Sequence, residues 1–255
     1  HYHSLKKLKK DCLLSNNFFK LYKKFSPGPI TYVLKLKKNN EISKNVTNKN
    51  KTLAVRFPKH ALTQRLLKEI KFPLAAPSAN ISTKISPVCK EDVKDEFGKK
   101  IKFILNGGRS KIGLESTIID LTNKPKILRQ GFITSNKIYK ILRKKILISK
   151  KNKTIKSPGQ LKLHYSPGIP VYVNRIRAKK NGAFITFGKK FKNSKNYFNL
   201  SKKRNLGEAA NNLYSTMRNI KKLKFKSISV CKIPNFGLGR AINERLRKAS
   251  NKWIE

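Results

Sequence analysis

Apolar residues recur at helical spacing over the first part of the chain. Leu5, Leu8 and Cys12 lie three and four positions apart, and a similar spacing continues over residues 16–25. The pattern predicts two short helices within residues 4–25. Helices are also expected over residues 60–70, 91–97, 135–146, 208–220 and 240–252.

Short apolar runs between these helices predict the strands. We expect strands over residues 30–36, 52–58, 72–76, 101–105, 126–131, 171–174, 182–187 and 228–232, and another within 113–120. The Asn- and Lys-rich residues 37–51 are expected to form an exposed, mobile loop. Because strands alternate with helices, the pattern indicates an α/β or α+β fold, not an all-β fold or a helical bundle.

The hydrophobic pattern breaks at residues 149–168. This stretch contains a lysine-rich run followed by Ser157-Pro158-Gly159 and Ser166-Pro167-Gly168, which is typical of a linker. It also contains His164 and Tyr165, which a passive spacer does not need. We therefore predict a first domain over residues 1–148, a linker over 149–168 and a smaller α/β domain over 169–255.

Small polar residues gather just after the expected strand 72–76. Ser78, Asn80 and Ser86 stand at even positions there. Hydroxyl and amide donors with closely approaching backbone N–H groups suit an anionic ligand such as a nucleotide phosphate. The alternative is an Asx or serine turn closed by Pro87, and this stretch alone favours the turn.

Arg56 stands near the end of the expected strand 52–58. An arginine at a strand end can grip a carboxylate with two parallel N–H donors. It is equally one of 61 basic residues, and composition does not separate a binding residue from an ordinary surface cation.

The charge is far from balanced, with 61 Lys and Arg against 12 Asp and Glu and a net charge of +49. Such an excess favours a polyanion partner, RNA above all. However, Lys occurs in every segment, and Asn and Ile are also abundant, as an AT-rich coding bias produces. The coding bias explains most of the charge better than a binding surface does.

The spacing of the cysteines and the length of the apolar runs indicate in which cellular compartment the protein resides. Cys12, Cys89 and Cys231 lie far apart without metal-ligand spacing, so we expect no disulfide framework, no metal site and a reducing compartment. No apolar run approaches the length of a membrane span. We therefore expect a cytoplasmic protein without a membrane partner.

Several segments together resemble one family, the YrdC/Sua5 family of L-threonylcarbamoyladenylate synthases. The resemblance lies in Phe25-Ser-Pro-Gly-Pro-Ile-Thr-Tyr-Val-Leu34, Val55-Arg-Phe-Pro58, Ala75-Ala-Pro-Ser-Ala-Asn-Ile-Ser82, Glu115-Ser-Thr-Ile-Ile-Asp120 and Ile127-Leu-Arg-Gln-Gly131. Two further segments resemble the two-domain Sua5 branch: Ser157-Pro-Gly with His164-Tyr-Ser-Pro167, and Phe236-Gly-Leu-Gly-Arg-Ala-Ile-Asn-Glu-Arg-Leu246. The motifs occur in order along nearly the whole chain.

The resemblance implies a fold and an activity. The fold is a twisted, mixed and mostly parallel sheet around a large cavity, with the linker crossing the cavity mouth and a smaller Rossmann-like α/β domain at the C-terminus. The activity joins L-threonine, bicarbonate and ATP into threonylcarbamoyl-AMP and releases pyrophosphate. Other proteins then transfer the threonylcarbamoyl group to adenosine 37 of tRNA, a modification called t6A.

The resemblance also implies roles for individual residues. Those on the threonine side are His1, Arg56 for the carboxylate, Ala76 through its backbone, and Ser116. Those on the nucleotide side are Thr52, Ser78, Ser86 and Arg129, with Asn80 shaping the loop and Tyr165 closing over the ligand. No catalytic side chain is implied, because threonine's own amine and the resulting carbamate are the nucleophiles. Mg²⁺ is expected with ATP, and no metal site within the protein.

The family's Lys-x-Arg segment would precede the position of His1, together with the first strand and helix of the sheet. We therefore expect an N-terminal piece that the printed sequence lacks, and a chain without those cations would lose much of its phosphate binding and its activity. A basic RNA-binding protein of the same fold, without catalysis, is the alternative function. A carbamoyl-transfer module like those of hydrogenase maturation proteins is disfavoured, because no zinc-finger cysteines are present.

Overall fold

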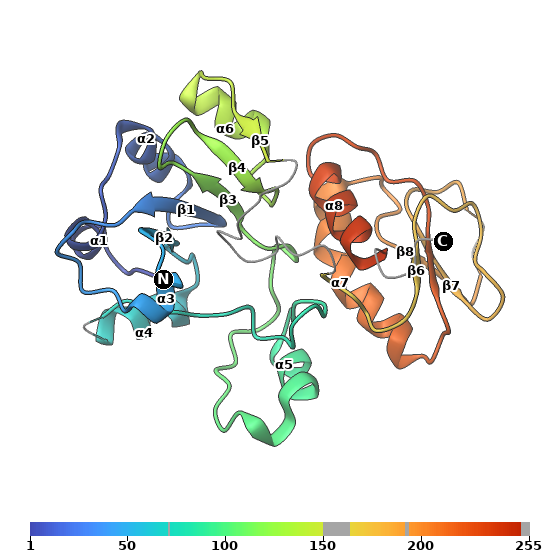
Figure 1. Cartoon of the computed structure of the whole chain (residues 1–255). Helices are drawn as coiled ribbons and strands as arrows, with labels where there is room; N and C mark the ends of the chain where they lie inside the picture. Colours follow the sequence, from blue (N-terminus) through green and yellow to red (C-terminus); the bar gives the residue numbers. More distant parts are fainter. Residues whose placement is uncertain (71, 150–163, 192–193, 251–255) are drawn as a thin grey trace. The chain divides into compact units, whose positions relative to one another are not determined.

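The computed structural model describes residues 1–70, 72–149, 164–191 and 194–250 (Figure 1). It divides into two compact units. The N-terminal unit comprises His1–Ala76 and Glu115–Gln160, and the C-terminal unit comprises Pro77–Leu114 and Leu161–Glu255. Residues 77–114, which the sequence placed in the first domain, thus belong to the C-terminal unit. Most of the expected linker 149–168 lies outside the described residues.

The N-terminal unit is built on a five-stranded sheet of order β2-β1-β3-β4-β5. Its strands are β1 (Ile30–Lys35), β2 (Thr52–Val55), β3 (Thr117–Asp120), β4 (Lys126–Arg129) and β5 (Leu147–Ile148). β1 runs antiparallel to β2 and parallel to β3, whereas β4 runs antiparallel to β3 and parallel to β5.

The mixed sheet is confirmed, but the expectation that it is mostly parallel is wrong, because two of its four pairings are antiparallel. Chain length explains one of these two antiparallel pairings, that of β3 with β4. A parallel pair needs a crossover of a dozen or more residues, and only residues 121–125 join β3 to β4.

Five helices accompany this sheet among the described residues: α1 (Leu5–Asp11), α2 (Asn16–Phe25), α3 (Lys44–Thr47), α4 (Ala61–Glu69) and α6 (Ser135–Leu142). Ser4 and Ser15 cap α1 and α2 by accepting hydrogen bonds from backbone N–H groups one turn ahead, which fixes where both helices begin. The residues expected to form only a loop, 37–51, contain the single-turn helix α3.

The core of the N-terminal unit lies on one face of the sheet. Side chains from α1, α2 and α6 join strand residues such as Tyr32, Val55 and Ile119 in one buried cluster. A much smaller cluster, Val33, Ile118 and Leu128, lies apart from it. Because successive strand residues point to opposite faces, this second cluster marks the other face of the sheet.

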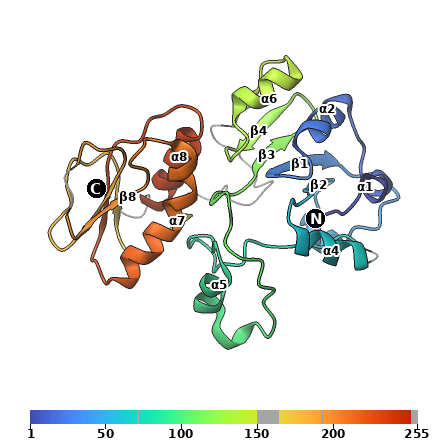
Figure 2. The same ribbon diagram turned by 180° about the vertical axis from the view of Figure 1, so that it is seen from behind.

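The C-terminal unit contains a parallel sheet of order β6-β9-β7-β8. Its strands are β6 (Val171–Tyr172), β7 (Ala183–Thr186), β8 (Tyr197–Asn199) and β9 (Ile228–Val230). The helices α7 (Leu206–Lys222) and α8 (Gly239–Ser250) lie together on one side of this sheet in both views (Figures 1 and 2). The expectation of a separate C-terminal α/β domain is thereby confirmed.

Residues 77–114 join the C-terminal unit through α5 (Lys90–Phe97) and the short 3-10 helix η1 (Gly98–Lys100). Ile85 and Val88 belong to the core of that unit. Arg218 of α7 donates a 2.6 Å hydrogen bond to the Ile85 carbonyl and lies 3.7 Å from Asp92 and 3.5 Å from Glu96. Burial and these charged contacts fix the segment to α7.

Two expected strands do not form. Residues 72–76 contain no strand, and Phe72 is 61% exposed. Pro73 within the run and Pro77 directly after it cannot donate ladder hydrogen bonds. Residues 101–105 are also irregular, with Phe103 88% exposed, because the described residues offer them no strand partner.

Among the described residues, no helix is long and apolar enough to cross a membrane.

Candidate functional site

Ser116 and Arg129 meet at the edge of β3 and β4. Arg129 Nε and Nη2 donate to the Ser116 carbonyl oxygen at 3.1 and 3.0 Å, and Nη2 also donates to Ser116 Oγ at 3.1 Å. Antiparallel pairing of β3 with β4 brings the two residues together, with a register shift beside Ile118. Both are buried, so the guanidinium has a fixed orientation.

A second hydroxyl completes this arrangement. Thr31 Oγ1 lies 2.7 Å from Ser116 Oγ across the parallel pair of β1 and β3. Sequence reasoning missed Thr31. The signal was a hydroxyl in a strand otherwise predicted to be well buried, where a polar side chain needs a partner.

Gly131 lets the backbone approach Ser116 closely. A Cβ at this position would lie 2.5 Å from the Glu115 carbonyl oxygen and 2.6 Å from the Ser116 carbonyl carbon, distances that real Cβ atoms essentially never show. Any larger residue would therefore push Glu115 and Ser116 out of place. The glycine after β4 is a positioning element of the site, not only a turn residue.

Arg56 lies just beyond β2. Its Nε donates to the Gly28 carbonyl at 3.2 Å, and its own carbonyl accepts from Tyr2 N–H at 3.0 Å. The neighbouring residue His1 pairs with Leu74 through backbone hydrogen bonds of 2.7 and 3.1 Å. His1, Arg56 and the chain leading to Ala76 are thus brought together within the N-terminal unit.

The two guanidiniums of this site repel each other. Burial, followed by the positive charge of Arg129, lowers the pKa of Arg56 from its ordinary value. A bound anion beside them would relieve both the desolvation and the repulsion. Arg129 Nη1 makes no hydrogen bond to the described part of the chain, so it remains a donor for such an anion.

These residues lie on the face of the sheet that α1, α2 and α6 leave uncovered. Along β2, Leu53 and Val55 point into the main core, so Thr52 and Arg56 point the other way. Thr52 and Arg56 lie roughly 13 Å apart along an extended chain, farther than an amino acid reaches.

The remaining predicted site residues belong to the C-terminal unit. Ser78 is exposed and Ser86 is buried. Asn80 Nδ2 donates to the Ile81 and Lys84 carbonyls at 2.8 and 3.0 Å, which closes the loop around it. The structure therefore groups His1, Thr52, Arg56, Ala76, Ser116 and Arg129 in one unit, and Ser78, Asn80, Ser86 and Tyr165 in the other.

Tyr165 is only 1% exposed. Its ring stacks on Tyr214 at 5.9 Å and lies 4.1 Å from the ring of His164, and the Arg245 guanidinium lies 5.2 Å from its centroid. Tyr165 also has a positive φ of 64°, which is uncommon for a bulky residue. The side chain is a packed member of the C-terminal unit's core.

The arrangement in the N-terminal unit suits binding and orientation. It offers two guanidiniums and two hydroxyls at one sheet face, which together recognise carboxylate and phosphate oxygens. No group of three or more His, Cys, Asp and Glu that could hold a metal occurs among the described residues.

Comparison with known proteins assigns both parts of the chain. A family model described as "Telomere recombination" (Sua5_yciO_yrdC) matches residues 1–131. A second, described as "Threonylcarbamoyl-AMP synthase, C-terminal domain", matches residues 133–251. These matches define an α/β protein of the Sua5/YciO/YrdC class.

Named relatives agree with the family models. A threonylcarbamoyl-AMP synthase of Pyrococcus abyssi is 34% identical over 252 residues, which are 92% of this chain and 74% of that protein. One of Bacillus subtilis is 32% identical over 249 residues, 90% and 72% of the two chains. A crystal structure of P. abyssi Sua5 complexed with L-threonine superposes with a TM-score of 0.88 at 31% identity, covering 98% of this chain and 78% of that one.

The chain belongs to the Sua5/YrdC family and has the two-domain Sua5 arrangement.

Proposed function

We propose that the protein is an L-threonylcarbamoyladenylate synthase, a nucleotidyltransferase that makes threonylcarbamoyl-AMP and pyrophosphate from L-threonine, bicarbonate and ATP for t6A37 modification of tRNA. The observation that carries the proposal is the Arg56, Ser116 and Arg129 cluster on one sheet face of a chain whose named relatives are threonylcarbamoyl-AMP synthases. Downstream threonylcarbamoyl-transfer proteins would be its functional partners.

In this proposal Arg56 binds the threonine carboxylate. Its Nε is already committed to the Gly28 carbonyl, which fixes the plane of the guanidinium. The carboxylate accepts hydrogen bonds from the terminal nitrogens, and its charge offsets the repulsion between Arg56 and Arg129. The threonine amine is then held in a defined position relative to the nucleotide.

The chemistry needs no protein nucleophile. Bicarbonate loses hydroxide to give CO2; the threonine amine attacks its carbon and gives up a proton, which leaves with the hydroxide as water. An oxygen of the resulting carbamate then attacks the α-phosphorus of ATP. The bond from the α-phosphorus to the bridging oxygen of the β-phosphate breaks, and pyrophosphate leaves with that electron pair. Positioning of the two substrates and neutralisation of phosphate charge supply the rate enhancement.

Arg129 orients the nucleotide side in this scheme, and Ser116, on the threonine side, holds it in place. Three hydrogen bonds to Ser116 hold the guanidinium, so its free Nη1 can donate to a phosphate or ribose oxygen without reorganising. Mg²⁺, which ATP brings with it, supplies further charge neutralisation when bound.

The experiment is a pyrophosphate-release assay on the protein as its gene encodes it. Release must require ATP, L-threonine and bicarbonate together, and mass spectrometry must detect threonylcarbamoyl-AMP. Arg56→Ala should strongly reduce threonine-dependent release at threonine concentrations that only half-saturate the parent protein, whereas Arg65→Ala, at an exposed position on α4, should leave it unchanged. RNA binding that weakens with salt, without any turnover, would instead establish the non-catalytic alternative.

A further inference from the structure

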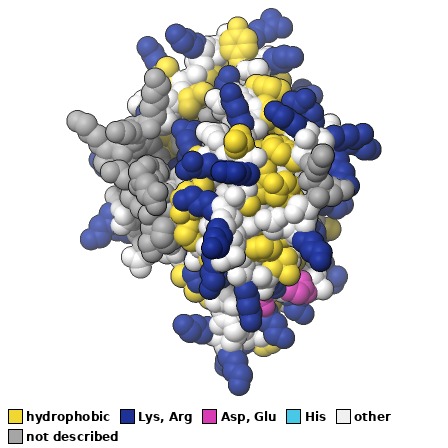
Figure 3. All heavy atoms as spheres, turned by 90° about the vertical axis from the view of Figure 1, so that its right-hand side faces the viewer, with side chains coloured by type: hydrophobic (Ala, Val, Ile, Leu, Met, Phe, Trp, Pro, Cys, Tyr) yellow, Lys and Arg dark blue, Asp and Glu magenta, His cyan; other side chains and the backbone are white. Residues whose placement is uncertain are grey.

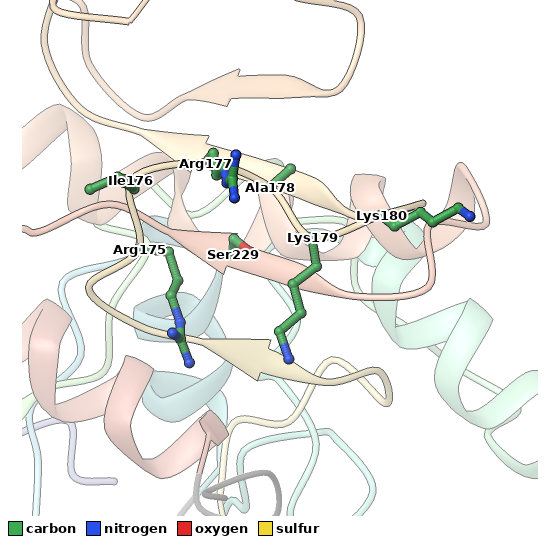
Figure 4. A pocket seen from close by; sticks show the side chains of 7 residues that line it. All are labelled: Arg175, Ile176, Arg177, Ala178, Lys179, Lys180 and Ser229. Carbon is green, nitrogen blue, oxygen red and sulfur yellow. The ribbon is translucent and has the colours of Figure 1, made fainter.

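A basic cavity in the C-terminal unit contains none of the residues of the proposed active site. Its volume is about 650 Å³, within the range of small-molecule sites. The lining residues are Arg175, Ile176, Arg177, Ala178, Lys179, Lys180 and Ser229 (Figure 4). Four of the seven are cations.

The topology of the sheet creates this cavity. β9 lies between β6 and β7, so the chain from β6 to β7 must cross β9. A parallel crossover is usually made by a helix, but residues 173–182 contain none. Since α7 and α8 lie on the other side, a loop alone crosses here and leaves a hollow against β9 (Figure 4).

The cations of the loop have no carboxylate partner among the described residues. Lys179 Nζ lies 3.6 Å from the Tyr172 ring centroid, and the Arg175 guanidinium lies 5.7 Å from the same centroid. Tyr172 therefore holds two of the charges in place without neutralising them. A ligand with negative charge could therefore neutralise these cations.

Ser229 adds a second, independent observation. The residue lies in the middle of β9, is fully buried and lines the cavity. Its Oγ has no hydrogen-bond partner among the described residues. A buried hydroxyl without a partner costs free energy, and a ligand oxygen at the base of the hollow would satisfy it.

We propose that this cavity binds a phosphate-bearing ligand of nucleotide size, either a free nucleotide or a nucleotide of an RNA strand. Guanidinium and ammonium groups together match the charge and the several acceptor oxygens of phosphates better than those of a single carboxylate. A lone phosphate ion would leave most of the volume empty. Ile176, which is 83% exposed, offers apolar surface for a base or sugar.

Basic residues are scattered widely over the face shown in Figure 3, so the test must separate this cavity from general attraction of anions. Amide NMR spectra of the whole protein give a local readout that the proposed active site does not affect. ADP should produce saturable shifts of the amides of residues 175–180 and of Ser229, whereas adenosine should not. A single-stranded pentaribonucleotide forms the second arm.

Two matched double variants test whether the cations of the cavity bind the ligand. The double variant with Arg177→Gln and Lys179→Gln should weaken ADP binding about tenfold or more, because each substitution removes a charge-assisted contact. Lys202→Gln with Lys203→Gln, two exposed lysines after β8, removes the same charge and should change the affinity less than about twofold. Ser229→Ala should fold normally, because its hydroxyl has no described partner, and should also weaken binding.

The two probes distinguish the two sources of the ligand. Saturation by ADP identifies a free nucleotide as the ligand class, and saturation by the RNA alone identifies a nucleic-acid strand. Absence of local shifts with both probes overturns the proposal. The proposal is also overturned if adenosine shifts these amides as much as ADP does, or if the Lys202 and Lys203 control weakens binding as much as the Arg177 and Lys179 variant does. In either case the cavity would not recognise phosphate. None of these outcomes depends on whether the protein makes threonylcarbamoyl-AMP.

Discussion

The guanidinium of Arg129 donates three hydrogen bonds to a single residue, Ser116, which belongs to the neighbouring strand segment. Two reach the carbonyl oxygen and one reaches the hydroxyl. The hydroxyl is at the same time within 2.7 Å of Thr31 Oγ1. One serine therefore fixes both the orientation of the cation and the packing of β1 against β3.

Ser116→Ala should therefore destabilise the fold and loosen the cation. The variant leaves the partly buried Thr31 hydroxyl and one donor of the buried Arg129 without their partner, which costs about 1–3 kcal/mol of unfolding free energy. The two bonds to the carbonyl oxygen remain, so the protein still folds. Urea unfolding followed by circular dichroism measures the change.

Thr31→Ser is the matched control, because it keeps the hydroxyl that faces Ser116. The unfolding free energy of Thr31→Ser should differ from that of the parent chain much less than the unfolding free energy of Ser116→Ala does. Equal stability of Ser116→Ala and the parent chain would show that the hydroxyl bridge contributes nothing.

Arg56→Ala should raise the KM for threonine far more than the KM for ATP. The guanidinium is oriented by the Gly28 carbonyl and, in the proposed function, binds the threonine carboxylate. Arg56→Lys should recover only part of the affinity, because an ammonium cannot make two parallel hydrogen bonds. Initial rates of pyrophosphate release at varied threonine and ATP give both constants.

Arg65→Ala is a control of the same residue type from the exposed side of α4. It removes one positive charge from the same unit and should leave both KM values unchanged. If Arg56→Ala raised both KM values equally, Arg56 would not be a threonine-specific residue.

The sequence predicted the helices well because spacing and capping agree there. Ser4 and Ser15 stand where α1 and α2 begin, and the apolar positions follow at the helical period. The run at 72–76 had apolar residues but also Pro73 within it and Pro77 directly after it, and it stayed irregular. β5 and β8, of two and three residues, are too short to produce a periodic signal.

The site was predicted residue by residue but not as a set of contacts. Arg129 and Ser116 were expected on the nucleotide and threonine sides, and their direct hydrogen bonds depend on strand pairing that no local pattern contains. Thr31 and Gly131 were missed for the same reason. Their roles appear only when a neighbouring strand or turn approaches within hydrogen-bonding or van der Waals distance.

The three free cysteines should differ sharply in reactivity. Burial raises the pKa of Cys12 to about 12 and that of Cys231 to about 11, so both remain protonated at about pH 8. The pKa of Cys89 is also raised, chiefly by desolvation, but its side chain is partly exposed. We expect iodoacetamide to label Cys89 first in the folded protein, with faster labelling as the pH rises towards its pKa.

Peptide mapping by mass spectrometry assigns each labelled thiol. Cys89→Ser should remove the fast phase, and urea should make the remaining two cysteines reactive. Rapid labelling of Cys12 in the folded protein would contradict its burial between α1 and the sheet.

Tyr165→Ala should destabilise the C-terminal unit, although the resemblance assigns this residue a role in covering the ligand. The side chain is 1% exposed and contacts Tyr214, His164 and Arg245, so its removal leaves a cavity costing about 3 kcal/mol or more. Tyr165→Phe keeps the ring and should preserve most of that stability. Urea unfolding of both variants, beside their ATP dissociation rates, separates the two roles. Faster dissociation in a normally stable Tyr165→Phe would assign the hydroxyl to the ligand, whereas an unchanged unfolding free energy in Tyr165→Ala would contradict the packing role.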